Sequence, residues 1–251
     1  MKALPPLPGC RTLGPMARRE APRAFTVCIH DVSPESALAI ERLASGVRSR
    51  LGDRFGVAVI AGRLEGPGSQ ALARLRAACG RAEVLAHGLH HLRAPAPSLY
   101  SWATLRSDEL VGLGAEETRR RVALARRRLE ELWDTDVAGF VPPAWRYGEA
   151  TMDLLAGEGY GYALGLTRLR RARSSVGLAT LSWDPGRFAE IAWGLELAGV
   201  LLGRLSSRVP CVVLHPRDLE RGLEGRAFAH IDALLRRGFS PLRPGELAAR
   251  G

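Results

Sequence analysis

The chain of 251 residues carries a formal net charge of +10, and 46% of its residues are hydrophobic and 25% charged. This composition is typical of a soluble globular protein, and no stretch reaches the roughly 18 uninterrupted apolar residues that a membrane span needs. Lys2 is the only lysine among 36 basic residues, and the arginines are scattered over predicted helix faces without interleaved aromatic residues. We therefore expect solvated helix surfaces, and neither a nucleic-acid nor a membrane partner.

The first 23 residues are rich in proline and arginine and lack the apolar core of about 7 to 15 residues that a signal peptide requires. We predict a disordered arm, residues 1–23, on a cytoplasmic protein. The four cysteines share no short spacing, which favours reduced thiols over disulfides or a zinc site; they are Cys10, Cys28, Cys79 and Cys211.

Strand-like and helix-like segments alternate along the rest of the chain. An apolar strand at 24–31 leads to Ser33-Pro34-Glu35, which has the pattern of a helix start: a serine cap, a proline and an acid. We predict strands at 24–31, 55–61, 82–87, 140–143, 162–166, 179–183, 210–215 and 239–242. We predict helices at 37–51, 69–78, 115–133, 149–156, 188–205 and 221–237, with a loop at 92–105 and a basic linker at 168–173. Six or seven β/α units without a break in composition indicate one barrel-like α/β domain.

Histidines follow three of these strands. His30, His87 and His215 each end an apolar run, and the carboxyl ends of parallel strands meet on one face of an α/β fold. His87 and His91 are four residues apart, so one helical turn after the strand would bring both rings to one side, as a divalent metal requires. The alternative is that His87 is a core residue and that His90 and His91 begin a solvated loop. Because three strands end in histidine on the same face, we favour a functional site over this alternative.

Five segments in this order resemble the motifs of the polysaccharide deacetylase superfamily. They are IHDVSP at 29–34, HGLHH at 87–91, FVPPAW at 140–145, LSWDPG at 181–186 and VVLHP at 212–216. The resemblance implies a distorted (β/α) barrel of about seven units, residues 24–251, that removes N-acetyl or O-acetyl groups from carbohydrates.

The resemblance also implies the roles of individual residues. Asp31, His87 and His91 would hold a divalent metal, most often Zn2+, and leave an open position for water. His215 would be the general acid that protonates the leaving group, unless it is a core histidine that caps a strand. Leu214 would line the acetyl pocket. Four further residues are candidates for substrate contact: Pro143, Trp145, Arg146 and Trp183. A tryptophan can stack on a sugar ring, but Trp145 can equally be a buried structural residue.

The chain departs from the family pattern at two places. The family opens its first motif with two aspartates, of which the first is the general base, but this chain has His30 before Asp31. The arginine that orients this base in the family is replaced by apolar sequence around Val141. The two losses are consistent, because the arginine has no carboxylate to orient. Three interpretations stay open: His30 is the base, Asp184 is the base, or hydrolysis is impaired. We favour His30.

The sequence therefore predicts a metal-dependent hydrolase that acts on an acetylated carbohydrate or a related small molecule. A cytoplasmic location fits a soluble substrate better than a cell-wall polymer. Two alternatives have different consequences. A carbohydrate-binding barrel without activity follows from the missing base aspartate, and a metallophosphoesterase would release phosphate instead of acetate.

Overall fold

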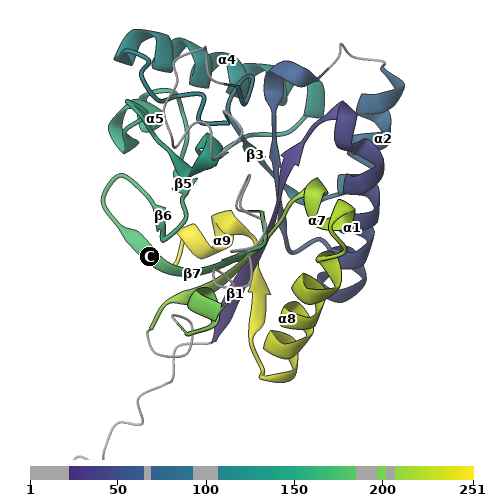
Figure 1. Ribbon diagram of the computed structural model, residues 1–251. Helices are drawn as coiled ribbons and strands as arrows, with labels where there is room; N and C mark the ends of the chain where they lie inside the picture. Colours follow the sequence, from purple (N-terminus) through teal and green to yellow (C-terminus); the bar gives the residue numbers. More distant parts are fainter. Residues whose placement is uncertain (1–22, 65–68, 93–106, 185–196, 202–206) are drawn as a thin grey trace, which may run out of the picture.

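The computed structural model describes residues 23–64, 69–92, 107–184, 197–201 and 207–251. Its strands form one sheet in the order β2-β3-β4-β5-β6-β7-β8-β1-β9, and a further pairing of β2 with β1 closes eight of them into a barrel (Figure 1). The strands are β1 Ala24–Val32, β2 Gly56–Val59, β3 Glu83–Ala86, β4 Gly139–Phe140, β5 Tyr162–Leu164, β6 Arg168–Arg170, β7 Ser175–Ser182, β8 Val209–Leu214 and β9 Ser240–Leu242.

Seven strands of the closed barrel run parallel, and β6 alone among its described strands is antiparallel to its neighbours. The barrel predicted from the sequence is thus confirmed as a mixed barrel in a single domain. The prediction of a basic linker at 168–173 is wrong. This segment forms β6 and the turn of a hairpin with β7, because Leu169 is apolar and buried between two exposed arginines.

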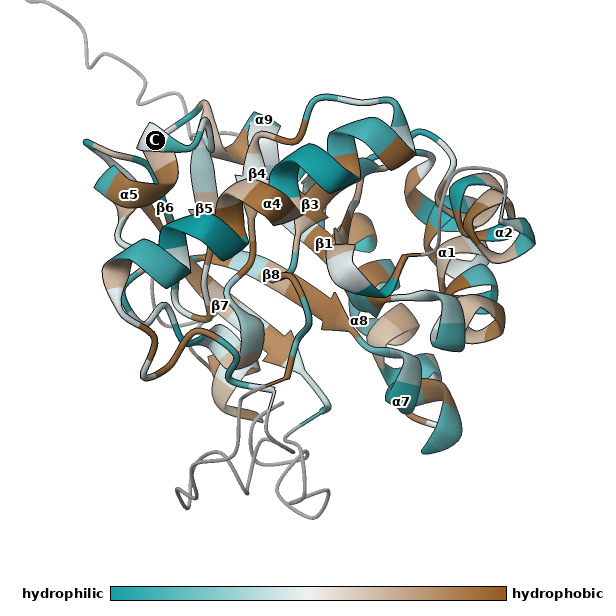
Figure 2. Ribbon diagram, turned by 90° about the horizontal axis from the view of Figure 1, so that it is seen from above, coloured by the Kyte–Doolittle hydropathy of each residue, from teal (hydrophilic) through white to brown (hydrophobic). Residues whose placement is uncertain are grey.

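Helices surround the barrel, and strands β1 and β8 lie as apolar ribbons inside the ring of helices (Figure 2). The helices are α1 Ala37–Leu51, α2 Gln70–Cys79, α4 Ala115–Trp133, α5 Met152–Gly157, α7 Pro216–Glu220, α8 Glu224–Arg236 and α9 Pro244–Ala248. Short 3-10 turns occupy Pro34–Ser36, Ala61–Arg63 and Pro143–Trp145. Sequence reasoning placed the longer helices but missed α7 and α9, each of five residues. Of the predicted helix 188–205, only 197–201 are described, and they are helical.

Local chemistry explains where the helices begin. The Ser69 hydroxyl accepts a hydrogen bond from the Leu72 amide at the start of α2, and the Thr151 hydroxyl caps α5 in the same way. Both caps satisfy amides that have no partner within the helix. No helix in the described ranges is long and apolar enough to cross a membrane. The proposed arm lies outside these ranges, apart from residue 23.

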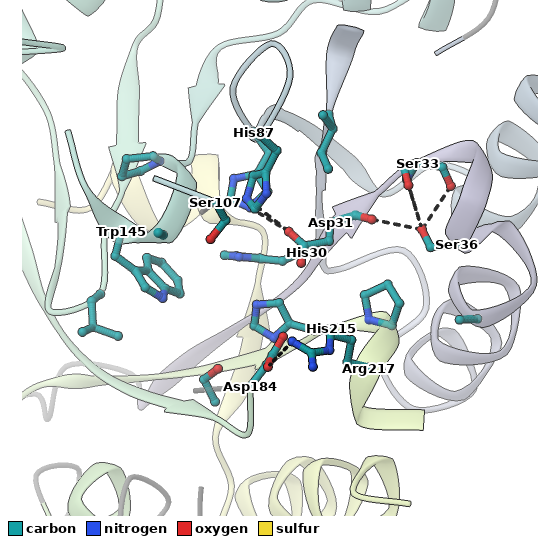
Figure 3. A pocket seen from close by; sticks show the side chains of 18 of the residues that line it. His30, Asp31, Ser33, Ser36, His87, Ser107, Trp145, Asp184, His215 and Arg217 are labelled. Atoms are coloured by element: carbon teal, nitrogen blue, oxygen red, sulfur yellow. Dashed lines mark hydrogen bonds and ion pairs between the residues drawn. The ribbon is translucent and has the colours of Figure 1, made fainter. Parts of the chain in front are cut away.

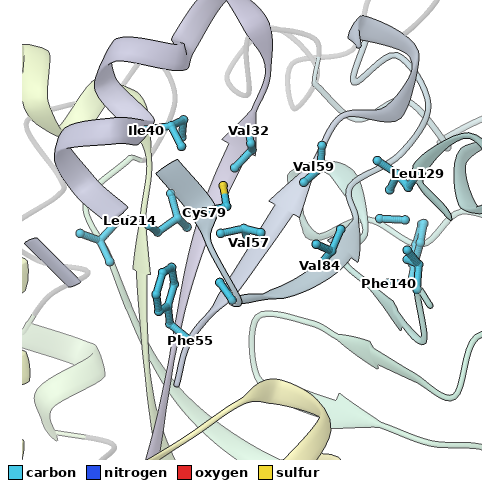
Figure 4. Close-up of a cluster of buried hydrophobic side chains, with 14 of the residues drawn as sticks. Val32, Ile40, Phe55, Val57, Val59, Cys79, Val84, Leu129, Phe140 and Leu214 are labelled. Atoms are coloured by element: carbon cyan, nitrogen blue, oxygen red, sulfur yellow. The ribbon is translucent and has the colours of Figure 1, made fainter. Parts of the chain in front are cut away.

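Two apolar clusters lie on the two faces of the barrel wall. The outer cluster packs alternate strand residues such as Val57 and Leu214 against Ile40 of α1 and Leu129 of α4 (Figure 4). The inner cluster fills the barrel with residues from the intervening strand positions: Cys28, Ala58, Leu85, Val141, Tyr162, Leu164, Leu178, Cys211 and Val213 are among them. Where a strand ends, this alternation therefore determines which side chains are directed toward the mouth of the barrel.

Cys28, Cys79 and Cys211 are buried free thiols, as predicted, whereas Cys10 lies outside the described residues. Burial raises the pKa of Cys79 and of Cys211 to about 12. These thiols are therefore apolar fillers of the core at neutral pH.

Candidate metal centre

The three histidines at strand ends meet at the mouth of the barrel, as the sequence predicted. Each follows an interior residue by two positions: His30 follows Cys28, His87 follows Leu85, and His215 follows Val213. Because side chains alternate along a strand, all three rings continue the interior rows into the mouth. The ring centroids of His30 and His87 are 4.9 Å apart, and those of His30 and His215 are 5.2 Å apart.

Asp31 breaks this alternation. It directly follows His30, so a regular strand would turn its side chain toward the helices. The register between β1 and β2 shifts between Ile29 and Val32, and the Asp31 backbone takes a left-handed φ of 56°. A bulge of this kind redirects a side chain, and here it brings the carboxylate of Asp31 to the same mouth as the His30 ring.

Three ligand atoms form a nearly regular triangle. The Asp31 Oδ1 atom is 3.2 Å from His87 Nε2 and 3.3 Å from His91 Nε2, and the two nitrogens are 3.1 Å apart. Two ligands of a tetrahedral zinc ion, each about 2.0 to 2.1 Å from the metal, are about 3.3 Å apart. Among the described residues, the buried Asp31 Oδ1 atom has no hydrogen-bond partner. Within the described part of the chain, this is the group of His, Cys, Asp and Glu residues that fits a metal ion.

The tautomer of His87 suits a metal ligand. Its Nδ1 atom lies 3.0 Å from the carbonyl oxygen of Val141. A carbonyl only accepts hydrogen bonds, so Nδ1 carries the proton and Nε2 presents its lone pair to the triangle. Val141 thus contributes its backbone at the place where the family pattern has an arginine.

Electrostatics favour the protonation states that bind a cation. Burial lowers the pKa of His91 to about 3, and so that imidazole is neutral at neutral pH. Burial raises the pKa of Asp31, but the adjacent His91, a hydrogen bond with His87 and the nearby His215 outweigh it and hold this pKa well below its usual range. One carboxylate and neutral imidazoles are the ligand forms that zinc needs.

A cleft of about 930 Å3 opens above the triangle. It is lined by His30, Asp31, His87, His91, Pro142, Trp145, Asp184 and His215, among others. Figure 3 shows His30 between Trp145 and Asp31, with His87 on one side and His215 on the other. In the described part of the chain, the buried His30 Nε2 and His215 Nδ1 atoms have no hydrogen-bond partner. Burial, and then the nearby His87 and His215, lowers the pKa of His30 well below its usual value. Two buried imidazoles therefore face the cleft with nitrogen atoms available for proton transfer.

Asp184 is held by two arginines. The Arg221 Nη1 atom donates to its Oδ1 at 3.0 Å, and Arg217 Nη1 lies 3.5 Å from the same oxygen. The Asp184 side chain is 9% exposed. These contacts hold the carboxylate in place between two cationic side chains.

The residues predicted to contact substrate divide into two groups. Trp145 lines the cleft, with its ring 4.9 Å from that of His30. Leu214 and Trp183 do not line the cleft. Leu214 directly precedes His215 on β8, so its side chain is on the opposite, outer face of the strand, where it is fully buried. Trp183 is 1% exposed and packs against His230.

Two other predicted contacts are also absent from the cleft lining. Pro143 is buried beside Gly88, and Arg146 is exposed outside it. His90 is exposed as well and does not line the cleft, in agreement with its interpretation as a loop residue.

Sequence reasoning also missed two buried acids that support the site. Glu109 accepts hydrogen bonds from the backbone that carries His91, and Asp218 accepts one from the backbone amide of His215 at 2.7 Å. Asp218 stands three residues after His215, at the start of α7, and this spacing is the capping signal that could have revealed it. Glu109 is 18 residues from His91, and no local pattern joins them.

No family model and no curated protein matches the sequence. The search of solved structures finds a candidate polysaccharide deacetylase from Mycobacterium smegmatis, which is 17% identical with a TM-score of 0.61 over 92% of this chain and 91% of the other. A family 4 acetyl xylan esterase from Clostridium thermocellum, in complex with a cobalt ion, is 14% identical, with a TM-score of 0.53 over 90% of each chain.

A pseudoenzyme of carbohydrate esterase family 4 from Bacillus anthracis is 13% identical. Its TM-score is 0.56, over 90% of this chain and 66% of the other. The three proteins share with this chain a barrel that spans nearly all of it. The chain therefore has the fold of the family 4 carbohydrate esterases, which is the fold of the polysaccharide deacetylases.

Proposed function

We propose that the chain is a metal-dependent hydrolase of the polysaccharide deacetylase superfamily that removes an acetyl group from an N- or O-acetylated carbohydrate or a related small molecule. The observation that carries this proposal is the triangle of Asp31, His87 and His91. It shares one cleft with two buried imidazoles, each with one nitrogen that has no hydrogen-bond partner among the described residues. The fold supports it, because solved structures with this fold include acetyl xylan esterases and deacetylases.

Asp31, His87 and His91 would hold the metal, for which we propose zinc. When bound, zinc supplies positive charge that acidifies water and polarises an acyl carbonyl. The Val141 carbonyl keeps His87 in the ligating tautomer, and the bulge at Asp31 keeps the carboxylate in the triangle. These supports reduce the reorganisation that binding requires.

The two remaining imidazoles would transfer protons. His30 accepts the proton of the attacking water at its unpartnered Nε2 atom, and His215 donates a proton to the departing amine or alkoxide. Trp145 forms the wall beside His30 and offers an aromatic face to a sugar ring. The arginines on Asp184 support His30, and not Asp184, as the base.

A second candidate function is a carbohydrate-binding barrel without turnover. It is favoured by His30 at the position where the family has its base aspartate, and by the fold shared with a pseudoenzyme. A metallophosphoesterase is a third candidate, which release of phosphate from model esters would identify. The cytoplasmic location stays a prediction of the sequence.

The proposal is tested first by the metal content of the purified protein. We expect about one zinc, or another divalent ion, per chain, and loss of most of it in Asp31→Ala and in His91→Ala, because either change removes one of three ligands. Elemental analysis of the three proteins, prepared identically, measures this. Acetate release from acetylated sugars by the parent protein then separates a hydrolase from a binding barrel. Equal and substoichiometric metal in all three proteins would refute the metal centre.

The loss of activity caused by His215→Ala should depend on the leaving group of the substrate. We expect acetate release from an acetylated amino sugar to fall about 100-fold, because an amine needs a proton as it departs. Hydrolysis of 4-nitrophenyl acetate should change less than about tenfold, since its phenolate leaves without one. The two rates, measured on the same preparation of His215→Ala, test the role. An equal loss on both substrates would contradict general-acid catalysis by His215.

A further inference from the structure

We propose that Glu109 is a positioning residue of the metal centre: its carboxylate holds the backbone of 88–91 in the shape that places His91 against Asp31 and His87. The inference rests on the proposed function, since it concerns the same metal ligands. Glu109 lies just before α4, far from these ligands in sequence.

The contacts of Glu109 with this loop are unusually concentrated. Its Oε2 atom accepts backbone hydrogen bonds from Leu89 at 3.1 Å, His90 at 2.9 Å and His91 at 2.7 Å. Consecutive amides that converge on one atom form a concave anion site. Such a site can bind an anion, and here the carboxylate of Glu109 fills it.

This loop is not the helical turn that the spacing of His87 and His91 suggested. Gly88 has a φ of 71° and His91 a φ of 55°, so the chain wraps around the carboxylate with two left-handed residues. A Cβ atom at position 88 would lie 2.6 Å from Glu109 Oε2, which is too close for two non-bonded atoms. Only glycine therefore fits there without a shift of its neighbours. A left-handed histidine costs free energy, and the hydrogen bonds to Glu109 oppose that cost.

The second oxygen of Glu109 is anchored from another element. Arg121 Nη1 of α4 lies 3.3 Å from Glu109 Oε1, and Arg121 Nε also donates to Glu117 at 2.7 Å. The Glu109 side chain is fully buried and that of Arg121 is 17% exposed. A buried, paired carboxylate has little freedom to move, so α4 and the metal loop are joined through Glu109.

Removal of the carboxylate would leave three amides without their partner in a mostly buried loop. His91 would then have no support for its left-handed backbone, and its Nε2 atom would leave the triangle. Metal affinity should fall even though all three ligand side chains are present. Loss of a support of this kind typically weakens metal binding about 10- to 100-fold.

Glu83 provides a matched control at the opposite end of β3. Its carboxylate is also largely buried, and it accepts hydrogen bonds from the Tyr162 hydroxyl at 2.6 Å and from the Gly245 amide at 2.8 Å. It joins β3 to β5 and α9, and these contacts do not include the metal loop. Glu83→Ala should therefore destabilise the fold without a specific effect on metal affinity.

The test compares zinc affinity, measured by competition with a chromogenic chelator, in the parent protein, Glu109→Ala, Glu109→Gln and Glu83→Ala. We expect affinity to fall about 10- to 100-fold in Glu109→Ala and less in Glu109→Gln, whose amide oxygen can still accept the three hydrogen bonds. Glu83→Ala should stay within about twofold of the parent. Hydrogen exchange of the metal-free proteins should be faster at 89–91 in Glu109→Ala alone.

The outcomes separate the two proposals. If the parent protein binds no zinc, the metal centre is refuted and the inference on Glu109 falls with it. If the parent binds zinc and Glu109→Ala binds it equally well, only the role of Glu109 is refuted. An equal loss of affinity in Glu109→Ala and Glu83→Ala would also refute it, because general destabilisation would then explain the effect.

Discussion

Glutamine in place of His30 is expected to lower kcat for acetate release by a factor of about 10² to 10⁴, while the metal content stays that of the parent. General-base catalysis is typically worth this much, and glutamine keeps a polar side chain that accepts no proton at neutral pH. His30 is 1% exposed, and within the described residues its Nε2 atom has no hydrogen-bond partner, so this nitrogen is free to accept a proton. Steady-state kinetics on one acetylated sugar, beside elemental analysis, measures the effect.

The comparison for His30 is Asp184→Asn. Because Arg217 and Arg221 already engage the Asp184 carboxylate, we expect this change to reduce kcat much less than His30→Gln does. The reverse order, with activity kept in His30→Gln and lost in Asp184→Asn, would assign the base to Asp184. A parent protein that binds metal and carbohydrate without turnover would instead favour the binding barrel.

The barrel was predictable because its strands carry local signals. Apolar runs that end in a turn or a polar residue located most strands, and amphipathic spacing located α4 at its observed bounds, Ala115–Trp133. The short elements were not predictable. Helices α7 and α9 have too few residues to show a period, and β6 is a strand only because β5 and β7 pair with it on both sides. Its arginine-rich composition indicated a linker, and tertiary pairing overrode it.

The site was predictable to the extent that it follows from alternation at strand ends. His30, His87 and His215 lie in phase with interior residues, and the same rule excludes Leu214, which is out of phase with His215. Alternation alone would turn Asp31 toward the helices, and a bulge in β1 is what directs it to the mouth; only the resemblance of IHDVSP to a family motif indicated it as a ligand. The contact of Glu109 with the metal loop also depends on tertiary structure, since 18 to 20 residues separate the carboxylate from the amides whose hydrogen bonds it accepts.

Trp183→Ala is expected to lower the free energy of unfolding by about 3 to 5 kcal/mol, since truncation of a large buried aromatic side chain leaves a cavity. Trp183 is 1% exposed, belongs to the outer apolar cluster and packs against His230 of α8, with ring centroids 5.8 Å apart. A domain of this size should lose about 6 to 20 °C in Tm, which thermal denaturation measures. Trp145→Ala is the control: its side chain lines the cleft, so we expect a smaller loss of stability and a higher KM for an acetylated sugar. A raised KM with unchanged stability in Trp183→Ala would return Trp183 to the substrate site and refute its assignment to the core.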